Sequence, residues 1–146
     1  MVFHILAQID DVVVSRIDRS CVLRIQSATG SVLLTGDVGH RAERMLVKRY
    51  AERLRSDVIV VPHHGAKTSS SRLFLDAVQP QIAIVSRGSG NRYGHPDQSV
   101  IARYDDIQAL WLDTAKDGAV RVELTGKSMA WRTWRAGRLR YWHQRD

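Results

Sequence analysis

Two short, uninterrupted apolar runs constrain the fold more than any other feature of this sequence. They are DVIVVP at 57–62 and QIAIVS at 81–86. A strand with one solvated face alternates apolar and polar residues, whereas a strand buried on both faces is apolar throughout. Both runs therefore predict central strands of a sheet that is covered on both sides.

The remaining segments predict a mixture of hairpins, buried strands and helices. Strand patterns are found at 2–6, 20–27, 31–37, 109–113 and 119–124. Helices are expected at 40–55, at about 70–78, and from Pro96 to about Tyr104. A turn is expected at 116–118 and a last hairpin within 129–142. Because strands and helices do not alternate regularly, the fold class is α/β with a mixed sheet flanked by helices.

Composition places the chain among folded globular domains. Its 146 residues are 44% hydrophobic and 25% charged, so we expect a single domain over residues 1–146. No apolar stretch approaches the roughly 20 residues that cross a bilayer, and the N-terminus lacks the basic leader of a signal peptide. We therefore expect a soluble chain. The net charge of +7 favours anionic partners such as nucleic acid.

Three loops carry the residues best suited to chemistry, and each follows a predicted strand. LLTGD ends at Asp37, VVPHHG contains His63 and His64, and GNRYGHP contains His95. Loops at the same strand ends of an open α/β sheet converge on one crevice, where ligands bind. We therefore expect these three loops to form one site.

Each of these residues has a structural alternative. Asp37 is either an N-cap of the following helix or a metal ligand. His63 and His64 are either surface residues or metal ligands and acid–base groups, and on an extended segment only one of them would face the cleft. The predicted catalytic residues are Asp37, His64 and His95, and the predicted metal ligands are Asp37, His63 and His64.

A second group of residues is suited to holding an anion. KTSSS at 67–71 begins a helix, and its exposed N–H groups beside Lys67 would seat a phosphate; alternatively its hydroxyls cap the helix. Arg92 and Tyr93, beside His95, suit an anionic ligand that carries a base; alternatively, His95 simply braces its loop. The predicted substrate-binding residues are Lys67, Thr68, Ser69, Asn91, Arg92 and Tyr93.

Taken in order, SCVLRI, LLTGD, VPHHGAKTSSS, NRYGHP and DGAV closely resemble the metallo-β-lactamase-like domain of ComEC-type DNA-internalisation competence proteins. The resemblance runs from about Val2 to Leu124. It implies an αββα sandwich with a two-metal phosphodiesterase site, in which Asp37 bridges two divalent ions, zinc or manganese. His63 or His64 would ligate one of them, and a metal-bound hydroxide would attack phosphorus. Lys67, the serine-rich helix start and the His95 loop would hold the phosphate.

The sequence departs from that family in one respect. Metallo-β-lactamase-like enzymes take most metal ligands from an earlier H-x-[HD]-x-D-H cluster, which this chain lacks; His4 is its only histidine before Asp37. We therefore expect the second half of the sandwich only, with a site that is incomplete in this chain alone. A half-sandwich exposes a sheet face, so we also expect a homodimer or exchanged elements that cover it.

The resemblance also implies a biological setting. The chain would be part of a DNA-uptake protein that handles DNA, single-stranded in our expectation, during transformation at the cell envelope. Its partners would be that DNA and the membrane channel portion of the parent protein. The alternatives are a non-catalytic DNA-binding or assembly module, and a small-molecule phosphodiesterase of the same superfamily.

The C-terminal segment 131–146 interleaves arginines with aromatic residues. The residues are Arg132, Arg135, Arg138, Arg140 and Arg145 with Trp131, Trp134, Tyr141 and Trp142. Such a pattern suits single-stranded nucleic acid, because bases stack on aromatic rings while guanidinium groups meet phosphates. The alternative, which we favour from sequence, is a hairpin turning at Ala136–Gly137 with its aromatic rings packed on the core.

Overall fold

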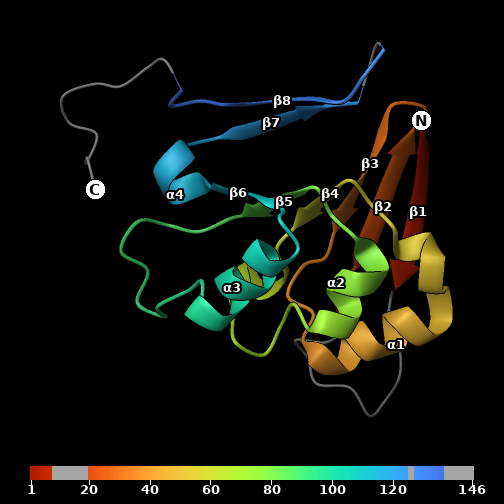
Figure 1. The fold of residues 1–146 in the computed structure, drawn as a ribbon, viewed down its shortest axis with the longest axis horizontal. Helices are drawn as coiled ribbons and strands as arrows, with labels where there is room; N and C mark the ends of the chain where they lie inside the picture. The colour runs from red at the N-terminus through yellow and green to blue at the C-terminus, as the bar shows by residue number, and fades with distance from the viewer. Residues whose placement is uncertain (8–19, 125–126, 137–146) are drawn as a thin grey trace.

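The structure is a computed structural model that describes residues 1–7, 20–124 and 127–136. Its main element is a six-stranded sheet in the order β1-β2-β3-β4-β5-β6 (Figure 1). The strands are β1 (Val2–Ala7), β2 (Val22–Ser27), β3 (Gly30–Leu34), β4 (Val58–Val60), β5 (Ile82–Val85) and β6 (Leu110–Asp113). The first three strands are antiparallel and β3 to β6 are parallel. The predicted α/β class with a mixed sheet is confirmed.

Helices cover one face of this sheet. They are α1 (His40–Tyr50), the 3-10 turn η2 (Ala51–Leu54), α2 (Arg72–Val78) and α3 (Gln98–Asp106). In Figure 1, α1, α2 and α3 lie together on the same side of the strands. Leu46, Phe74 and Tyr104 of these helices pack on Leu33 and Ile59 of the sheet, and all five are buried. None of the helices among the described residues is both long and apolar enough to span a membrane.

A two-stranded sheet lies on the opposite face of the main sheet (Figure 1). It consists of β7 (Val120–Glu123) and β8 (Ala130–Thr133), which pair antiparallel after the short helix α4 (Thr114–Asp117). Val120 and Val122 of β7 pack on Val58, Ile82 and Leu112. This second layer explains why both apolar runs, in β4 and β5, are buried.

Within the described part of the chain, the second layer leaves part of that face uncovered. The register pairs Phe3 with Ile25 and Ile25 with Val32, so these three residues share the face on which β7 packs. Val32 lies against the β7–β8 layer, but Phe3 is 61% exposed and Ile5, two residues further along β1, is 70% exposed. The predicted exposed apolar sheet surface is therefore present at β1.

Two helix predictions and one turn prediction differ from the structure. The helix expected at 40–55 ends at Tyr50, because Ala51 adopts φ 42°, and the chain continues as the 3-10 turn η2. Pro96 does not begin a helix; α3 begins at Gln98, and the Asp97 carboxylate accepts a hydrogen bond from the Ser99 N–H as its N-cap. Residues 116–118, expected as a turn, include the end of α4.

The hairpin expected near the C-terminus is also different. Residues 130–133 pair with β7, and the expected turn at Ala136–Gly137 reaches residues outside the described part of the chain. The favoured expectation that the aromatic rings pack on the core is wrong for Trp131 and Trp134, which are 43% and 60% exposed. β3 also ends at Leu34, three residues before the expected end, because Gly36 turns the chain with φ 57°.

Candidate functional site

The loops that follow β3 and β4 bring Asp37 and His64 together. The two strands are parallel neighbours, so their carboxyl ends lie at the same edge of the sheet. The Nε2 atom of His64 is 3.8 Å from the Oδ1 atom of Asp37, and both side chains are about half exposed. Asp37 is not the N-cap of α1, because Gly39 occupies that position. Its carboxylate is therefore left to face the histidine and solvent.

A hydrogen bond to the main chain determines which nitrogen of the His64 ring carries the proton. Its Nδ1 atom lies 2.6 Å from the carbonyl oxygen of Ser86, at the end of β5. A carbonyl oxygen only accepts hydrogen bonds, so Nδ1 carries the proton and donates it. In the neutral ring, Nε2 then presents its lone pair toward Asp37. Histidines that bind metals are usually oriented in this way, with the second ring nitrogen donating to a carbonyl or carboxylate.

The two histidines have an unusual backbone conformation. They lie in the 3-10 turn η3 (Pro62–Gly65), where His63 has φ 50° and His64 has φ 55°, instead of the extended segment expected from the sequence. Positive φ is uncommon outside glycine, and each such residue costs on the order of 1–3 kcal/mol. The His63 N–H donates to the Gly36 carbonyl at 3.0 Å, which ties this strained turn to the Asp37 loop.

The His63 ring lies against the third predicted loop. Its ring centroid lies 6.1 Å from that of His95, in an edge-to-face arrangement. Its Nδ1 atom is buried and has no hydrogen-bond partner among the described residues. A buried ring nitrogen without a hydrogen bond costs about 1–3 kcal/mol of stability, so a ligand that pairs with His63 Nδ1 would be favoured here.

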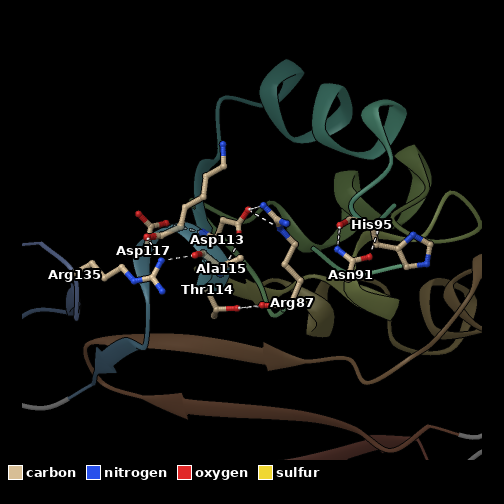
Figure 2. A network of polar contacts seen from close by, with 9 residues as sticks. Arg87, Asn91, His95, Asp113, Thr114, Ala115, Asp117 and Arg135 are labelled. Atoms are coloured by element: carbon tan, nitrogen blue, oxygen red, sulfur yellow. Dashed lines mark hydrogen bonds and ion pairs between the residues drawn. The ribbon is translucent and has the colours of Figure 1, made fainter. Parts of the chain in front are cut away.

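The His95 loop is held by an asparagine. The Asn91 side chain donates to the His95 carbonyl at 2.7 Å and accepts from the His95 N–H at 3.0 Å, as drawn in Figure 2. Tyr93 stacks on the His95 ring with a centroid distance of 6.0 Å. The Arg92 guanidinium lies over the Tyr93 ring, 5.0 Å from its centroid. Asn91 therefore positions the loop, whereas the exposed Arg92 and Tyr93 are accessible from solvent.

The serine segment is turned inward. Ser69 is buried, and its hydroxyl lies within hydrogen-bond distance of the Pro62 and Ala66 carbonyl oxygens. The N–H groups of Ser70 and Ser71 donate to the buried carboxylate of Glu43, which comes from α1. These two N–H groups therefore face a carboxylate of the chain itself, and Lys67 and Thr68 are the members of the predicted phosphate seat with exposed side chains.

Glu43 was not identified from the sequence, although it organises this segment. Burial raises the pKa of its carboxyl group above the ordinary value, and the hydrogen bonds from Ser71 and Ser70 oppose that shift. Glu43 sits within an otherwise ordinary helical pattern and contacts residues about thirty positions away, so no local signal marks it. Its carboxylate does the helix-capping that the serine hydroxyls were expected to do, since Ser71 makes no side-chain cap bond.

A polar network extends the site along the ends of β5 and β6 (Figure 2). Arg87 and Asp113 form a largely buried ion pair, with 2.6 Å between Nη2 and Oδ2. The Arg87 N–H donates to the Thr114 hydroxyl at 2.9 Å, and the other oxygen of Asp113 accepts from the Ala115 N–H. Sequence reasoning missed this pair, because the arginine follows β5 and the aspartate ends β6, 26 residues further along the chain.

Two open clefts flank the His95 loop, and both are lined by Arg87, Asn91 and His95. One, of about 240 Å³, also contains His64 and Tyr93. The other, of about 500 Å³, extends to Trp111 and Lys116. The predicted convergence of the three loops on one region is confirmed by these contacts, whereas the roles assigned to their residues stay predictions.

The described residues do not form a complete metal centre. Catalytic zinc sites take three protein ligands, and within 1–7, 20–124 and 127–136 no group of three His, Cys, Asp or Glu side chains is placed to hold a metal. Asp37 and His64 have the right donor atoms and orientation for two ligands of such a site. Further ligands would have to come from outside the described residues.

The chain is similar to parts of several much longer known proteins. It is 41% identical over 106 residues to "Competence protein ComA" of Neisseria gonorrhoeae, covering 73% of this chain and 15% of that protein. It is 38% identical over 112 residues to "Recombination protein 2" of Haemophilus influenzae, and the match covers 75% of this chain and 14% of that protein. It is 32% identical over 119 residues to "ComE operon protein 3" of Bacillus subtilis, and this match covers 82% of this chain and 15% of that protein. No family model matches the chain.

Proposed function

These homologues, named for competence and recombination, indicate a competence-protein family, and on that premise we propose that the chain handles DNA during uptake. The chain spans 14% to 15% of the length of these three relatives, so it would act as one segment of a longer protein. Within it, the loops around Asp37, His64 and His95 would form one wall of a metal-dependent phosphodiesterase site of the metallo-β-lactamase type.

The observation that carries this proposal is the geometry of His64. Its Nδ1–H is bound by the Ser86 carbonyl, and its free Nε2 faces the Asp37 carboxylate at 3.8 Å. An imidazole lone pair and a carboxylate oxygen that converge on one point are suited to a shared divalent cation. This geometry favours His64 over His63 as the metal ligand, a choice that sequence spacing leaves open.

The other residues of the site would act on the substrate. Arg92 and Tyr93 are exposed beside His95, so they would contact a phosphate and a base of the bound strand. Because the described residues hold fewer than three metal ligands, the catalytic centre would be completed by other parts of the longer protein. The chain would then supply two metal ligands and the side of the site that contacts the substrate. It would act beside the membrane channel portion of the longer protein, at the cell envelope.

A second candidate function is a non-catalytic DNA-binding module. The lack of a three-ligand group among the described residues and the net charge of +7 both favour it. In that case the same loops would bind the sugar-phosphate backbone without cleaving it. The two candidates differ in whether any form of the protein hydrolyses DNA.

Cleavage of a fluorescent single-stranded oligonucleotide in the presence of Mn²⁺ tests the proposal. We expect no cleavage by this chain alone and cleavage by the longer protein that contains it. In the longer protein, Asp37→Ala or His64→Gln should lower the rate by about 100-fold or more, because each removes a metal ligand. His4→Gln, at an exposed histidine on β1, is the matched control and should leave the rate unchanged.

Two results would count against hydrolysis by this site. Cleavage that survives Asp37→Ala and His64→Gln would place the catalytic centre elsewhere in the longer protein. If this chain and the longer protein both bind DNA but neither cleaves it with any divalent metal ion, the non-catalytic DNA-binding module is the better description.

A further inference from the structure

We propose that the outer face of the β7–β8 hairpin is a binding platform for single-stranded nucleic acid, and that it delivers the strand to the His95 cleft. This inference deepens the proposed function and rests on it for the biological role of the strand. The binding surface itself is argued from the hairpin alone.

The hairpin has two distinct faces. Val120 and Val122 point toward the main sheet, so Arg121 and Glu123, which alternate with them, point outward. The register places Arg132 opposite Arg121, which puts both guanidinium groups on the outer face. Both arginine side chains are exposed.

Trp134 lies directly beyond β8, at the end of the hairpin near α4. It lies two residues beyond Arg132, and its N–H donates to the Ala119 carbonyl at 2.8 Å, which continues the antiparallel ladder past the end of β8. The next N–H, of Arg135, donates to the Asp117 carbonyl at 3.0 Å, so Trp134 stays beside this end of the hairpin. Trp134 is 60% exposed, so much of its indole is accessible from solvent. A nucleobase is the flat, apolar partner that stacks on such a ring beside cations.

The charge of the face also fits a polyanion. Glu123 pairs with Arg121 at 2.9 Å and lies 3.9 Å from Arg132, so one negative carboxylate lies beside two positive guanidinium groups. A net positive charge therefore remains next to the exposed indole. The full sequence continues this composition with further arginines at 138, 140 and 145.

The hairpin is physically connected to the candidate site. Arg135, directly after Trp134, donates from Nη1 to the carbonyls of Ala115 and Lys116 in α4. Figure 2 shows Arg135, the Asp113–Arg87 pair and His95 arranged in one row. Lys116 lines the cleft of about 500 Å³ together with Arg87 and His95. A strand stacked on Trp134 would thus reach the cleft across a surface that carries lysine and arginine side chains.

Fluorescence anisotropy with a labelled oligodeoxythymidylate of about 20 nucleotides tests the platform, because one domain covers about 4–16 nucleotides. EDTA is included so that neither metal binding nor hydrolysis contributes. Trp134→Ala should weaken binding about tenfold through loss of stacking, whereas Trp134→Phe should stay within about threefold of wild type. Circular dichroism verifies that each variant is folded.

The arginines are tested through the salt dependence. Each phosphate contact on a single strand contributes about 0.7 to the slope of log affinity against log salt concentration, so Arg121→Ala/Arg132→Ala should lower that slope by about 1.4. Arg44→Ala/Arg53→Ala removes the same charge from exposed positions on α1 and η2, in the helical layer across the sheet. This matched control should leave the slope nearly unchanged.

The inference is overturned if Trp134→Ala binds as tightly as wild type, or if the control pair lowers the salt slope as much as the hairpin pair. Equal affinity for duplex DNA of the same length would overturn the single-strand assignment. The hairpin variants retain Asp37 and His64, so loss of DNA binding in them is independent of metal binding. Failure of the platform and failure of the metal site are thereby distinguishable.

Discussion

Gly65 packs directly against Pro96, and this contact joins the histidine turn after β4 to the loop after β5. A Cβ atom built on Gly65 would lie 2.5 Å from the Pro96 Cβ and 3.0 Å from its Cα. The Asp97 N–H also donates to the Gly65 carbonyl at 2.9 Å. The relative position of His63, His64 and His95 therefore depends on a residue without a side chain at 65.

Gly65→Ala should destabilise the protein by about 2 kcal/mol or more, because it adds a clash with Pro96 to the strain of a positive φ of 83°. Gly90→Ala is the matched control, since Gly90 has a similar φ of 65° but open space around it. It should carry only the conformational cost, about 1 kcal/mol. Urea unfolding measures both, and equal losses of stability in the two variants would contradict the packing described here.

Glu43 should matter for stability through the two serine N–H groups that it accepts. Glu43→Ala would leave the N–H groups of Ser70 and Ser71 without this acceptor, at about 1–3 kcal/mol for each buried group. We expect a loss of about 2–4 kcal/mol in the free energy of unfolding. Glu52→Ala, at an exposed glutamate of η2, should change it by less than about 0.5 kcal/mol. A loss near zero for Glu43→Ala would exclude the capping role.

The same residue predicts a pH dependence. Burial raises the pKa of Glu43 above 4.5 in the folded state, so the folded state binds a proton more readily than the unfolded chain. The contribution of Glu43 to stability is therefore fully present below the unfolded pKa and is lost as the pH rises through the folded pKa. Glu43→Gln removes this contribution. Its stability relative to wild type should accordingly rise from about pH 4 upward and then level off; the opposite slope would contradict the raised pKa.

The sequence predicted the architecture well where burial alone determines the pattern. The runs in β4 and β5 are apolar because layers cover both faces of the sheet, and the loops after β3, β4 and β5 converge because parallel strands end at one edge. The contacts that orient the site depend on residues distant in the chain. Glu43 with Ser70, Gly65 with Pro96, and His64 with Ser86 leave no local periodicity, so the sequence did not predict them.

The uncovered apolar surface at β1 predicts self-association of the chain. Phe3 and Ile5 expose large side chains on the face that the β7–β8 layer leaves open. We expect a concentration-dependent dimer in sedimentation velocity experiments, weakened at least about tenfold by Phe3→Gln/Ile5→Thr, because apolar burial drives the association. Leu73→Gln, at a half-exposed leucine of α2, is the control and should not affect the dimer. A folded monomer at all concentrations would rule out the homodimer.

Paramagnetic NMR of the isolated chain tests the central claim most directly, since bound Mn²⁺ broadens only the signals of nearby nuclei. We predict that substoichiometric Mn²⁺ broadens the amide signals of Asp37, His63 and His64 first, and leaves those of β1 around His4 sharp. Asp37→Ala should abolish this selectivity, because the carboxylate and the His64 Nε2 atom would hold the ion together. Broadening that is centred elsewhere, or that persists unchanged in Asp37→Ala, would contradict the account.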